Sequence, residues 1–384
     1  MSPTVMFIAG EDSGDQHGAR VIRELRALRP DVKVFGYGGT RMEAEGMQLT
    51  ENLAQKFPII GFTPVLQNLP RILGLLREAA QLLKTRRPDA LVLIDYPGFN
   101  LRTAKVAKRL GIPVIYYISP QFWVWHKGRL KVIATTVDKM LVILPFEKDL
   151  YAAAGMKSEY VGHPLQDDET AVLPVQETRA RLGVDPGSQL IGLLPGSRRS
   201  EIQRHLPLLL ETARLIRQRF PGCSFVVPRA ATIPESLLRE YLGACPDVEV
   251  LIADRDLKSV RAAMDFAVCK SGTSTLELAL LGVPMVIFYK VSAVTYAFAK
   301  RVVKIRWIGL VNIVAGREVV PELIQQDATP RRLSETVCGI LGDSTRLEQM
   351  RAGLAEVRGR IGGPGAGKRV AGEICAVLES RARN

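Results

Sequence analysis

Short apolar runs, each followed by a segment with a helical pattern, recur along the whole chain. In the first half we expect strands at Val5–Ala9, Lys33–Tyr37, Ala90–Ile94, Val114–Ile118, Met140–Leu144 and Tyr160–Val161. In the second half we expect them at Leu190–Leu194, Ser224–Val227, Val248–Ile252, Phe266–Val268 and Met285–Tyr289. Near-continuous apolar strands are typical of parallel sheets that helices cover on both faces. The pattern therefore predicts an α/β protein with two doubly wound sheets.

The polar stretch Pro164–Glu177 separates the two series of strands. With 384 residues the chain is long enough for two domains, and we place them at 1–168 and 169–361. The remaining segment, 362–384, begins with a glycine-rich hinge and ends in a helix over about 368–381. Its G-x-x-x-x-G-K string resembles a phosphate-binding loop, but Arg369 stands where Ser or Thr would hold magnesium. The last helix either packs back on the first domain or exchanges with a second subunit, which leaves a homodimer open.

The charge balance is strongly basic. Lys and Arg number 52 against 39 Asp and Glu, a formal net charge of +13. Such an excess attracts nucleic acid, anionic lipid or phosphorylated ligands alike. No apolar run approaches the roughly 18–20 residues that cross a bilayer, and the first residues do not resemble a signal peptide. We therefore expect a cytoplasmic protein that at most sits on a membrane surface.

Neither a disulfide framework nor a metal centre is expected. The five cysteines are scattered and never form a C-x-x-C pair, which fits reduced cytosolic thiols. Only four histidines occur, and no H-E-x-x-H motif is present. Asp254-Arg255-Asp256 resembles the D-x-D metal site of one class of sugar transferases, but two acids in a polar loop are weak support for it.

Acidic and small residues follow two of the predicted strands. Glu11, Ser13, Gly14 and Asp15 lie in a turn after the first strand, and we expect a helix to begin around 16–19. Such a strand, turn and helix presents backbone amides to an anion or a sugar, although Ser13 or Asp15 could simply cap the helix.

Asp95 ends another strand. It follows four apolar residues and precedes Tyr96 to Asn100, so its carboxylate is expected at the same edge of the sheet and partly desolvated. A carboxylate in that setting is a candidate general base for a hydroxyl group. The alternative is an aspartate that caps a turn.

The second half repeats this arrangement with basic and hydroxyl residues. Gly196, Ser197 and Arg198 lie between a strand and a helix, which suits a diphosphate. A second turn holds Ser271, Gly272 and Thr273, followed by Glu277 in the first part of a helix. Two such turns in one domain predict a nucleotide diphosphate site, with Glu277 accepting hydrogen bonds from ribose hydroxyls.

One stretch suits neither an ordinary core nor an ordinary surface. An apolar loop leads into a helix whose apolar positions cover more than one packing face, with several cations beside it. Elements of this kind bind acidic lipid at a membrane surface, although a buried helix under a hydrophobic loop would look similar. The candidate lipid-facing residues are Ile60, Phe62, Val65, Leu66, Leu69, Ile72, Leu73 and Leu76.

Taken in order, the motifs resemble one family. They are G-E-D-S-G-D at 10–15, I-D-Y-P-G-F-N at 94–100, S-P-Q-F-W-V-W at 119–125, L-P-F-E at 144–147, G-H-P at 162–164, L-P-G-S-R at 194–198, S-G-T-S-T-L-E at 271–277 and N-I-V-A-G-R-E at 312–318. The combination resembles the lipid-A-disaccharide synthases over about 5–323. The resemblance implies a GT-B fold, two Rossmann-like domains facing a central cleft.

The resemblance also implies the reaction and its partners. The donor is UDP-2,3-diacylglucosamine, the acceptor is 2,3-diacylglucosamine 1-phosphate, and the products are a β-1,6 disaccharide and UDP. An inverting transfer without cofactor or metal is implied, at the cytoplasmic face of the inner membrane of a Gram-negative cell.

The resemblance assigns site residues position by position. Asp95 is implied as the base on the acceptor hydroxyl, with Glu11 as a second catalytic acid. Ser13, Gly14, Asp15 and Asn100 are implied on the acceptor side. On the UDP side the implied residues are Gly196, Ser197, Arg198, Ser271, Gly272, Thr273, Glu277, Asn312 and Arg317.

Two other classes of function remain open. Another GT-B enzyme of UDP-sugars, such as a peptidoglycan-precursor transferase or an epimerase, would share the glycine and serine turns but is not expected to share the whole motif order. A nucleic-acid-binding protein would explain the charge of +13. However, the basic residues are dispersed and no nucleic-acid-binding motif is present, so no nucleic acid is expected as a partner.

Overall fold

The computed structural model describes residues 2–53, 69–120, 127–292, 296 and 306–383. The chain forms two compact units. Unit 1 consists of Met1–Asp168 together with Gly362–Asn384, and unit 2 of Glu169–Ile361. The end of the chain therefore belongs to the same unit as its beginning.

Unit 1 is built around a parallel sheet that has seven strands in the described part of the chain, in the order β3-β2-β1-β4-β5-β6-β7. Its elements are β1 (Thr4–Ala9), α1 (Asp12–Leu28), β2 (Lys33–Gly38), α2 (Thr40–Ala44), β3 (Gln48–Asn52), α5 (Leu69–Arg86), β4 (Ala90–Ile94), α6 (Pro97–Arg109), β5 (Val114–Tyr117), α8 (Lys127–Thr136), β6 (Lys139–Val142), α9 (Pro145–Ala153), β7 (Ser158–Tyr160), the 3-10 helix η1 (Pro164–Asp167) and α19 (Ala366–Ala382). The order reverses between β1 and β4, and ligands of open α/β sheets bind outside the carboxyl ends of the strands at such a point.

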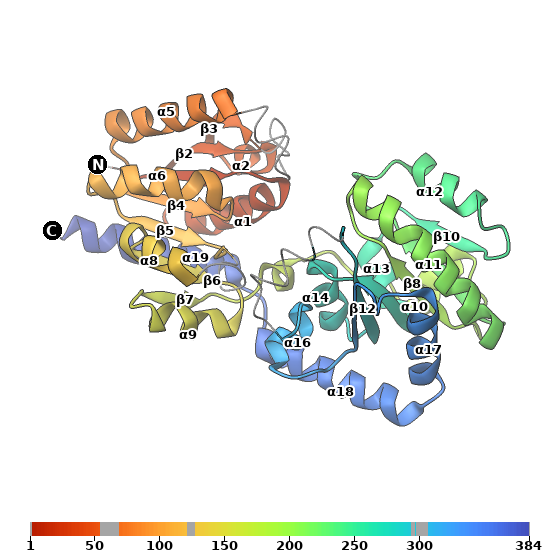
Figure 1. Cartoon of the computed structure of the whole chain (residues 1–384). Coiled ribbons are helices and arrows are strands. Elements are labelled where there is room, and N and C mark those ends of the chain that lie inside the picture. Colours follow the sequence, from red (N-terminus) through yellow and green to blue (C-terminus); the bar gives the residue numbers. More distant parts are fainter. Residues whose placement is uncertain (1, 54–68, 121–126, 293–295, 297–305, 384) are drawn as a thin grey trace. The chain divides into compact units, whose positions relative to one another are not determined.

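Both faces of this sheet are covered, so its strands are apolar on both sides. Met6 and Ile8 of β1 pack with α5, α6, α8 and α9. Val5 and Phe7 of the same strand pack with α1 and α19 on the opposite face. Figure 1 shows α5 and α6 on one side of the sheet. The alternation explains why the strand reads as a continuous apolar run.

The glycine-rich segment before α19 is fixed by an acidic side chain. The carboxylate of Asp167 accepts hydrogen bonds from the backbone amides of Gly365, Ala366 and Gly367 at 2.6, 3.1 and 2.8 Å. These amides form the first turn of α19, where an anion is favoured by the helix dipole. The position that a phosphate would take in a phosphate-binding loop is therefore already filled by a side chain of the protein. Arg369 reinforces the join by donating from Nε to the carbonyl of Val161 at 2.8 Å.

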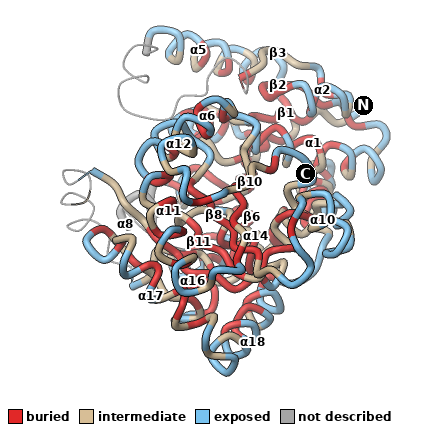
Figure 2. The backbone as a smooth tube through the Cα atoms, turned by 90° about the vertical axis from the view of Figure 1, so that its right-hand side faces the viewer, coloured by how far each residue is buried: buried red, intermediate tan, exposed pale blue. Residues whose placement is uncertain are grey.

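Unit 2 has a second parallel sheet, with six strands in its described residues, in the order β10-β9-β8-β11-β12-β13. Its elements are α10 (Val175–Leu182), β8 (Leu190–Leu194), α11 (Arg199–Arg219), β9 (Ser224–Pro228), α12 (Glu235–Gly243), β10 (Val250–Ala253), α13 (Leu257–Ala262), β11 (Phe266–Lys270), α14 (Thr273–Leu280), β12 (Met285–Tyr289), α16 (Leu310–Ala315), β13 (Glu322–Ile324), α17 (Pro330–Leu341) and α18 (Ser344–Ile361). The central strands are buried, whereas the helices expose their outer faces (Figure 2). Here the strand order reverses between β8 and β11.

The predicted strands are present, with ends that shift by a few residues. Two short edge strands, β3 and β13, were not predicted because each is short and includes polar residues. The first helix begins at Asp12 and not around 16–19, so the acidic turn after β1 is itself the first turn of α1. Within the described residues, no helix has the length and apolar character that crossing a bilayer requires.

Candidate active site

The first cluster of candidate residues lies where β1 and β4 end side by side. These strands pair in parallel with Ala9 opposite Ile94, so the residues that follow them start next to each other. Gly10 lies against the ring of Tyr96, and a Cβ atom at Gly10 would come within 2.3 Å of that ring. A side chain at position 10 would therefore displace the Tyr96 ring.

Asp95 leaves the strand in an unusual backbone conformation. Asp95 and Tyr96 have φ angles of 45° and 46°, in the left-handed region that non-glycine residues rarely occupy. Hydrogen bonds hold this turn: the carbonyl of Asp95 accepts from Asn100 Nδ2 at 2.7 Å and from the Tyr116 hydroxyl at 2.5 Å. The amide of Asp95 donates to the carbonyl of Tyr117 at 3.0 Å. Backbone strain of this kind, held by its surroundings, is concentrated at functional sites.

The environment of Asp95 favours a carboxyl group that can exchange its proton near neutral pH. Burial, and secondly the negative charge of Glu11, raise the pKa of Asp95 to about 6. Glu11 is half-buried at the N-terminus of α1. The two predicted catalytic acids, Asp95 and Glu11, therefore lie close enough for their charges to interact. A base with a pKa just below the operating pH is well matched to proton abstraction.

Asn100 was predicted to bind the acceptor, and the structure places it beneath Asp95. Its side chain is fully buried, and Nδ2 donates to the carbonyls of both Ile94 and Asp95. The amide nitrogen therefore fixes the backbone that carries the carboxylate.

Ser13, Gly14 and Asp15 occupy the first turn of α1. Ser13 is exposed and Gly14 is buried. Asp15 is buried, and its two carboxylate oxygens accept hydrogen bonds from the amides of Gly39, Arg41 and Met42 at 2.9, 3.1 and 3.0 Å. Asp15 thus joins α1 to the start of α2 and sets the position of the turn.

A buried acid of α9, Glu147, holds the start of the loop after β5. Ser119 donates to Oε1 of Glu147 at 2.7 Å, and the amide of Leu144 donates to Oε2 at 3.2 Å. Glu147 is only 1% exposed. The Glu147 carboxylate therefore fixes the start of the loop whose two tryptophans, in 121–126, lie outside the described residues.

The second cluster lies where β8 and β11 of unit 2 end side by side. Gly196 has a φ of 122°, and a Cβ there would meet Oε2 of Glu201 at 2.2 Å. Glu201 in turn accepts from the amides of Ser197 and Arg198 at 3.0 and 3.3 Å. This carboxylate shapes the turn, while the Arg198 side chain stays about half exposed.

Lys270 joins the two turns of unit 2. It is the last residue of β11, and its Nζ lies 3.0 Å from Oε1 of Glu201. Burial alone would raise the pKa of Glu201, but the hydrogen bond and charge of Lys270, with the amide of Ser197 and the charge of Arg198, lower it overall. Lys270 and Arg198 therefore place two cations around a single ionised carboxylate, next to the amides of both turns.

The turn after β11 is arranged like a phosphate-binding turn. Gly272 caps α14, and Thr273 begins the helix, so backbone amides are available at its N-terminus. Ser271 donates to the carbonyl of Ile308 at 3.0 Å. Glu277 faces Arg261, with Oε2 3.4 Å from the guanidinium.

Asn312 was predicted to bind the nucleotide, and its side chain is used within the protein. Nδ2 donates to the carbonyl of Val320 and to Glu322 Oε1, both at 2.8 Å. Oδ1 accepts from the amides of Val319 and Val320. Asn312 and Glu322 thus tie α16 to β13.

Arg317 and the D-x-D acids make ion pairs. Arg317 lies 2.5 Å from Glu356 of α18. Asp254 pairs with Arg229 at 3.1 Å and Asp256 with Arg181 at 3.3 Å. Within the described residues, no group of three or more His, Cys, Asp or Glu side chains is placed to hold a metal ion.

The sequence model of the family described as lipid-A-disaccharide synthetase matches residues 5–358. The chain belongs to this family. Two relatives named lipid-A-disaccharide synthase are very similar to it. That of Geobacter metallireducens is 43% identical over 374 residues, covering 97% of each chain. That of Anaeromyxobacter dehalogenans (strain 2CP-C) is 44% identical over 378 residues, covering 98% of each.

Solved structures place this member of the family in the GT-B fold. The chain resembles the calicheamicin glycosyltransferase with a TM-score of 0.61 at 16% identity, covering 98% of each chain. It also resembles UDP-GlcNAc 2-epimerase from Neisseria meningitidis bound to UDP-GlcNAc, with a TM-score of 0.62 at 13% identity, covering 98% of this chain and 100% of the other. At these identities the likeness supports the fold only.

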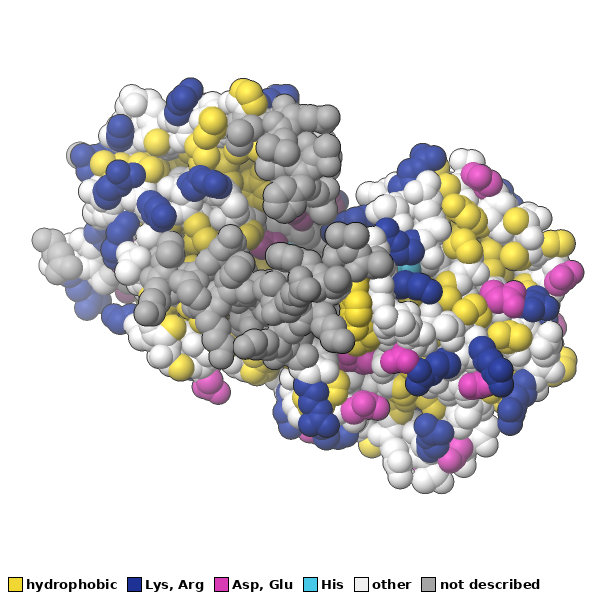
Figure 3. Space-filling model, viewed as in Figure 1, with side chains coloured by type: hydrophobic (Ala, Val, Ile, Leu, Met, Phe, Trp, Pro, Cys, Tyr) yellow, Lys and Arg dark blue, Asp and Glu magenta, His cyan; other side chains and the backbone are white. Residues whose placement is uncertain are grey.

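The candidate lipid-facing residues are only partly described. Ile60, Phe62, Val65 and Leu66, and the side chain of Leu69, lie outside the described residues. On α5 the core-facing residues are Leu75, Ala79 and Leu83, at a helical spacing of four, with Ile72 and Leu76 partly buried and Leu73 42% exposed. Figure 3 shows basic side chains interspersed with hydrophobic ones over the region of α5 and α6.

Several residues of the site were not predicted. Tyr96, Tyr116 and Glu322 act through contacts with residues at other places along the chain. Two others had a local signal: Lys270 stands directly before the S-G-T turn, and Glu201 stands in the first turn of α11, where it caps the amides of Ser197 and Arg198.

Proposed function

We propose that this member of the lipid-A-disaccharide synthetase family transfers 2,3-diacylglucosamine from UDP-2,3-diacylglucosamine to 2,3-diacylglucosamine 1-phosphate. The products are the β-1,6 disaccharide 1-phosphate and UDP. The observation that carries this proposal is the family match over residues 5–358. The relatives at 43% and 44% identity, which match over nearly their whole length, support it.

The acceptor is activated by Asp95. Its carboxylate takes the proton of the acceptor 6-hydroxyl while that oxygen attacks the anomeric carbon of the donor. The pKa of about 6 supports this role, because most Asp95 carboxyl groups are then ionised at neutral pH and still basic enough to accept a proton. Glu11 acts on Asp95 through its charge, and Ser13 and Gly14 offer a hydroxyl and a backbone amide to the acceptor.

The departing UDP is stabilised by unit 2. As the new bond to oxygen forms, the bond from the anomeric carbon to the diphosphate breaks and the electron pair leaves with UDP. Arg198, Lys270 and the amides of Gly272 and Thr273 supply positive charge and hydrogen bonds where that charge develops. Attack from the face opposite UDP inverts the anomeric centre. Because these groups already neutralise the diphosphate, the proposed transfer needs no metal.

Glu277 is proposed to accept hydrogen bonds from the ribose of UDP. Its contact with Arg261 orients the carboxylate. Asn312 and Arg317 are proposed to act on the nucleotide indirectly, because the contacts of Asn312 with Glu322 and of Arg317 with Glu356 support the α16 region.

We propose that the enzyme binds the cytoplasmic face of an anionic membrane through α5 and the residues before it, since both substrates carry acyl chains. Leu73→Ser should then weaken sedimentation with anionic vesicles severalfold. Leu28→Ser is the matched control, because Leu28 is 46% exposed on α1. Equal vesicle binding by both variants and the unaltered protein would refute the role of α5.

A separate proposal is that two copies assemble through α19, and a measurement of molar mass in solution tests it.

The function is tested by incubating the purified protein with both acylated sugars and analysing the products by mass spectrometry. The expected result is equimolar UDP and disaccharide 1-phosphate. Epimerised UDP-sugar without disaccharide, or no UDP release, would contradict the proposal.

A further inference from the structure

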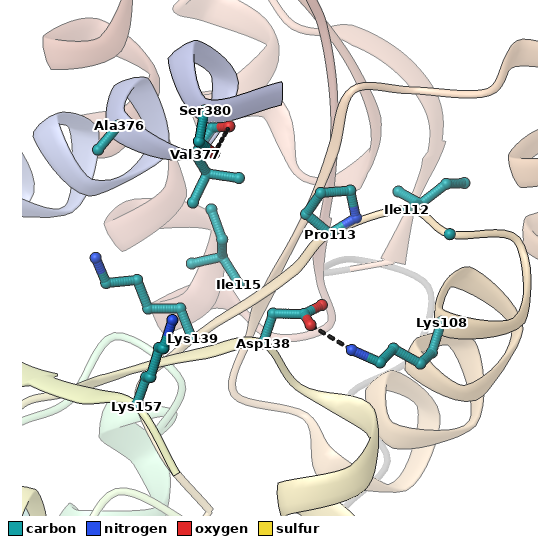
Figure 4. Close-up of a pocket in the computed structure, with 11 residues that line it drawn as sticks. Lys108, Ile112, Pro113, Ile115, Asp138, Lys139, Lys157, Ala376, Val377 and Ser380 are labelled. Carbon is teal, nitrogen blue, oxygen red and sulfur yellow. Dashed lines mark hydrogen bonds and ion pairs between the residues drawn. The ribbon is translucent and has the colours of Figure 1, made fainter. Parts of the chain in front are cut away.

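A cavity of about 450 Å³ lies at the amino ends of β5 and β6, at the edge of the unit 1 sheet opposite to Asp95. Its walls come from the end of α6, the starts of these strands, the residue before β7 and the last turns of α19 (Figure 4). The volume is within the range of small-molecule sites. The cavity therefore differs in place and in lining from the site at the carboxyl ends of the strands.

Two lysines line this cavity on adjacent segments, Lys139 at the start of β6 and Lys157 directly before β7. Ile115 pairs with Lys139, and Met140 pairs with Ser158 in the same register, so Ile115, Lys139 and Lys157 form one row across the sheet. Like charges directly opposite on a sheet are destabilising. The arrangement calls for negative charge beside the two ammonium groups.

The acidic residues near the cavity neutralise two of its three lysines. Lys139 makes an ion pair with Glu373 of α19. Lys108 on the rim pairs with Asp138, which also accepts the amide of Val114 at 2.9 Å. Lys157 has no hydrogen bond or ion pair from its amino group to the described residues, although it lines the cavity. One ammonium group is thus left to interact with a ligand.

The remaining walls are apolar. Pro113, Ala376 and Val377 line the cavity with side chains that are at least partly exposed. Ile112 and Ile115 also belong to the lining but are buried, and Val377 packs against the core cluster that contains Ile115 (Figure 4). Ser380 donates its hydroxyl to the carbonyl of Val377 at 2.8 Å. An ammonium group beside such walls favours a ligand that has both an anionic head and an apolar part.

We propose that this cavity binds an anionic amphiphile, a single phosphate or carboxylate head on a short apolar chain. The head lies against Lys157, beside the ion pair of Lys139 with Glu373, and the chain lies against the partly exposed Pro113 and Val377. Such a molecule could be a soluble acyl compound or a lipid of the membrane. The proposal does not depend on the transferase reaction, because none of these residues belongs to the site around Asp95.

The test is calorimetric titration of the full chain with octyl phosphate below its micelle concentration. Lys157→Gln should weaken binding about tenfold, since one charge-assisted hydrogen bond is lost. Lys33→Gln is the matched control, because Lys33 is an exposed lysine at the amino end of β2 in the same sheet, and its affinity should not change. Circular dichroism and thermal melting establish that both variants fold.

Further probes test both parts of the ligand. Octanol and inorganic phosphate should each bind more weakly than octyl phosphate, and Val377→Ser should weaken octyl phosphate but not inorganic phosphate. Equal affinity of the unaltered protein and Lys157→Gln for octyl phosphate would overturn the proposal, as would equal binding of octanol. If Lys157→Gln also lowers sedimentation with phosphatidylglycerol vesicles, the proposal stands with a membrane lipid as ligand. Unchanged sedimentation with weaker octyl phosphate binding supports a soluble amphiphile.

Discussion

Asp95 has a strained backbone conformation and a carboxyl group whose ionisation is disfavoured by burial. Its φ of 45° is held by Asn100 and Tyr116, and burial together with the charge of Glu11 raises its pKa to about 6. The raised pKa means that the folded state holds the Asp95 proton more tightly than the unfolded state does. The protonated carboxyl group therefore stabilises the folded state below the ordinary pKa of aspartate, and this stabilisation is lost as pH rises through about 6. An ionised Asp95 at neutral pH therefore lowers the stability of the folded protein.

This predicts the acidic limb of the rate profile. Because the base must be ionised, kcat/KM should fall as pH decreases below about 6. Glu11→Gln should move that limb to lower pH, since removing the neighbouring negative charge lowers the pKa of Asp95. Asp12→Asn is the control, because Asp12 is an exposed acid paired with Arg41 at 2.7 Å. A limb that stays in place in Glu11→Gln would show that this charge does not act on the base.

Among the elements, the turns after β1 and β4 depend on each other. Gly10 leaves space for the Tyr96 ring, which also stacks on Phe99 of α6 with ring centroids 6.0 Å apart. The Tyr96 ring therefore links the turn before α1 to the turn before α6.

Gly10→Ala tests this contact. Its Cβ would overlap the Tyr96 ring, so we expect a loss of stability of about 1–3 kcal/mol, typical of overpacking, and a marked loss of activity. Gly98→Ala is the control, because no heavy atom lies within 4 Å of a Cβ there. Urea unfolding and the transferase assay measure both effects. Equal behaviour of the two variants would remove the proposed link between the turns.

Part of the fold and of the site could be predicted from the sequence alone. Apolar periodicity located the central strands, because strands covered on both faces must be apolar throughout. It missed β3 and β13, which lie at the sheet edges and include polar residues. Motif order led to the prediction of Asp95 and Arg198 as site residues. It could not find Tyr116, whose role depends on a hydrogen bond to a residue 21 positions away that forms only in the folded chain. Nor could it show that the Asp15 and Asn312 side chains bond to backbone within the protein.

Considered as a whole molecule, the chain begins and ends in unit 1. Asp167 closes this unit by accepting from three amides at the start of α19, and α19 then packs against the core that contains α1. The proposed sites account for part of the net charge of +13, with Arg198 and Lys270 in unit 2 and lysines and arginines around α5 and the α19 cavity in unit 1.

Asp167→Asn tests the closure of unit 1. Loss of a charged cap should lower the free energy of unfolding by about 1–2 kcal/mol. Asp168→Asn is the matched control, because Asp168 lies 3.9 Å from Arg20 and is partly exposed, where ion pairs contribute little. Denaturant unfolding compares the two. A smaller loss in Asp167→Asn than in Asp168→Asn would contradict the account.

The proposed division of work assigns the base to unit 1 and the leaving group to unit 2. It is tested most directly by the transfer rate of Asp95→Asn with both acylated sugars, measured together with its affinity for UDP. We predict a loss of turnover of about 10²–10⁴-fold, the usual contribution of a general base, with UDP affinity unchanged. Turnover within a few-fold of the unaltered enzyme would show that Asp95 is not the base.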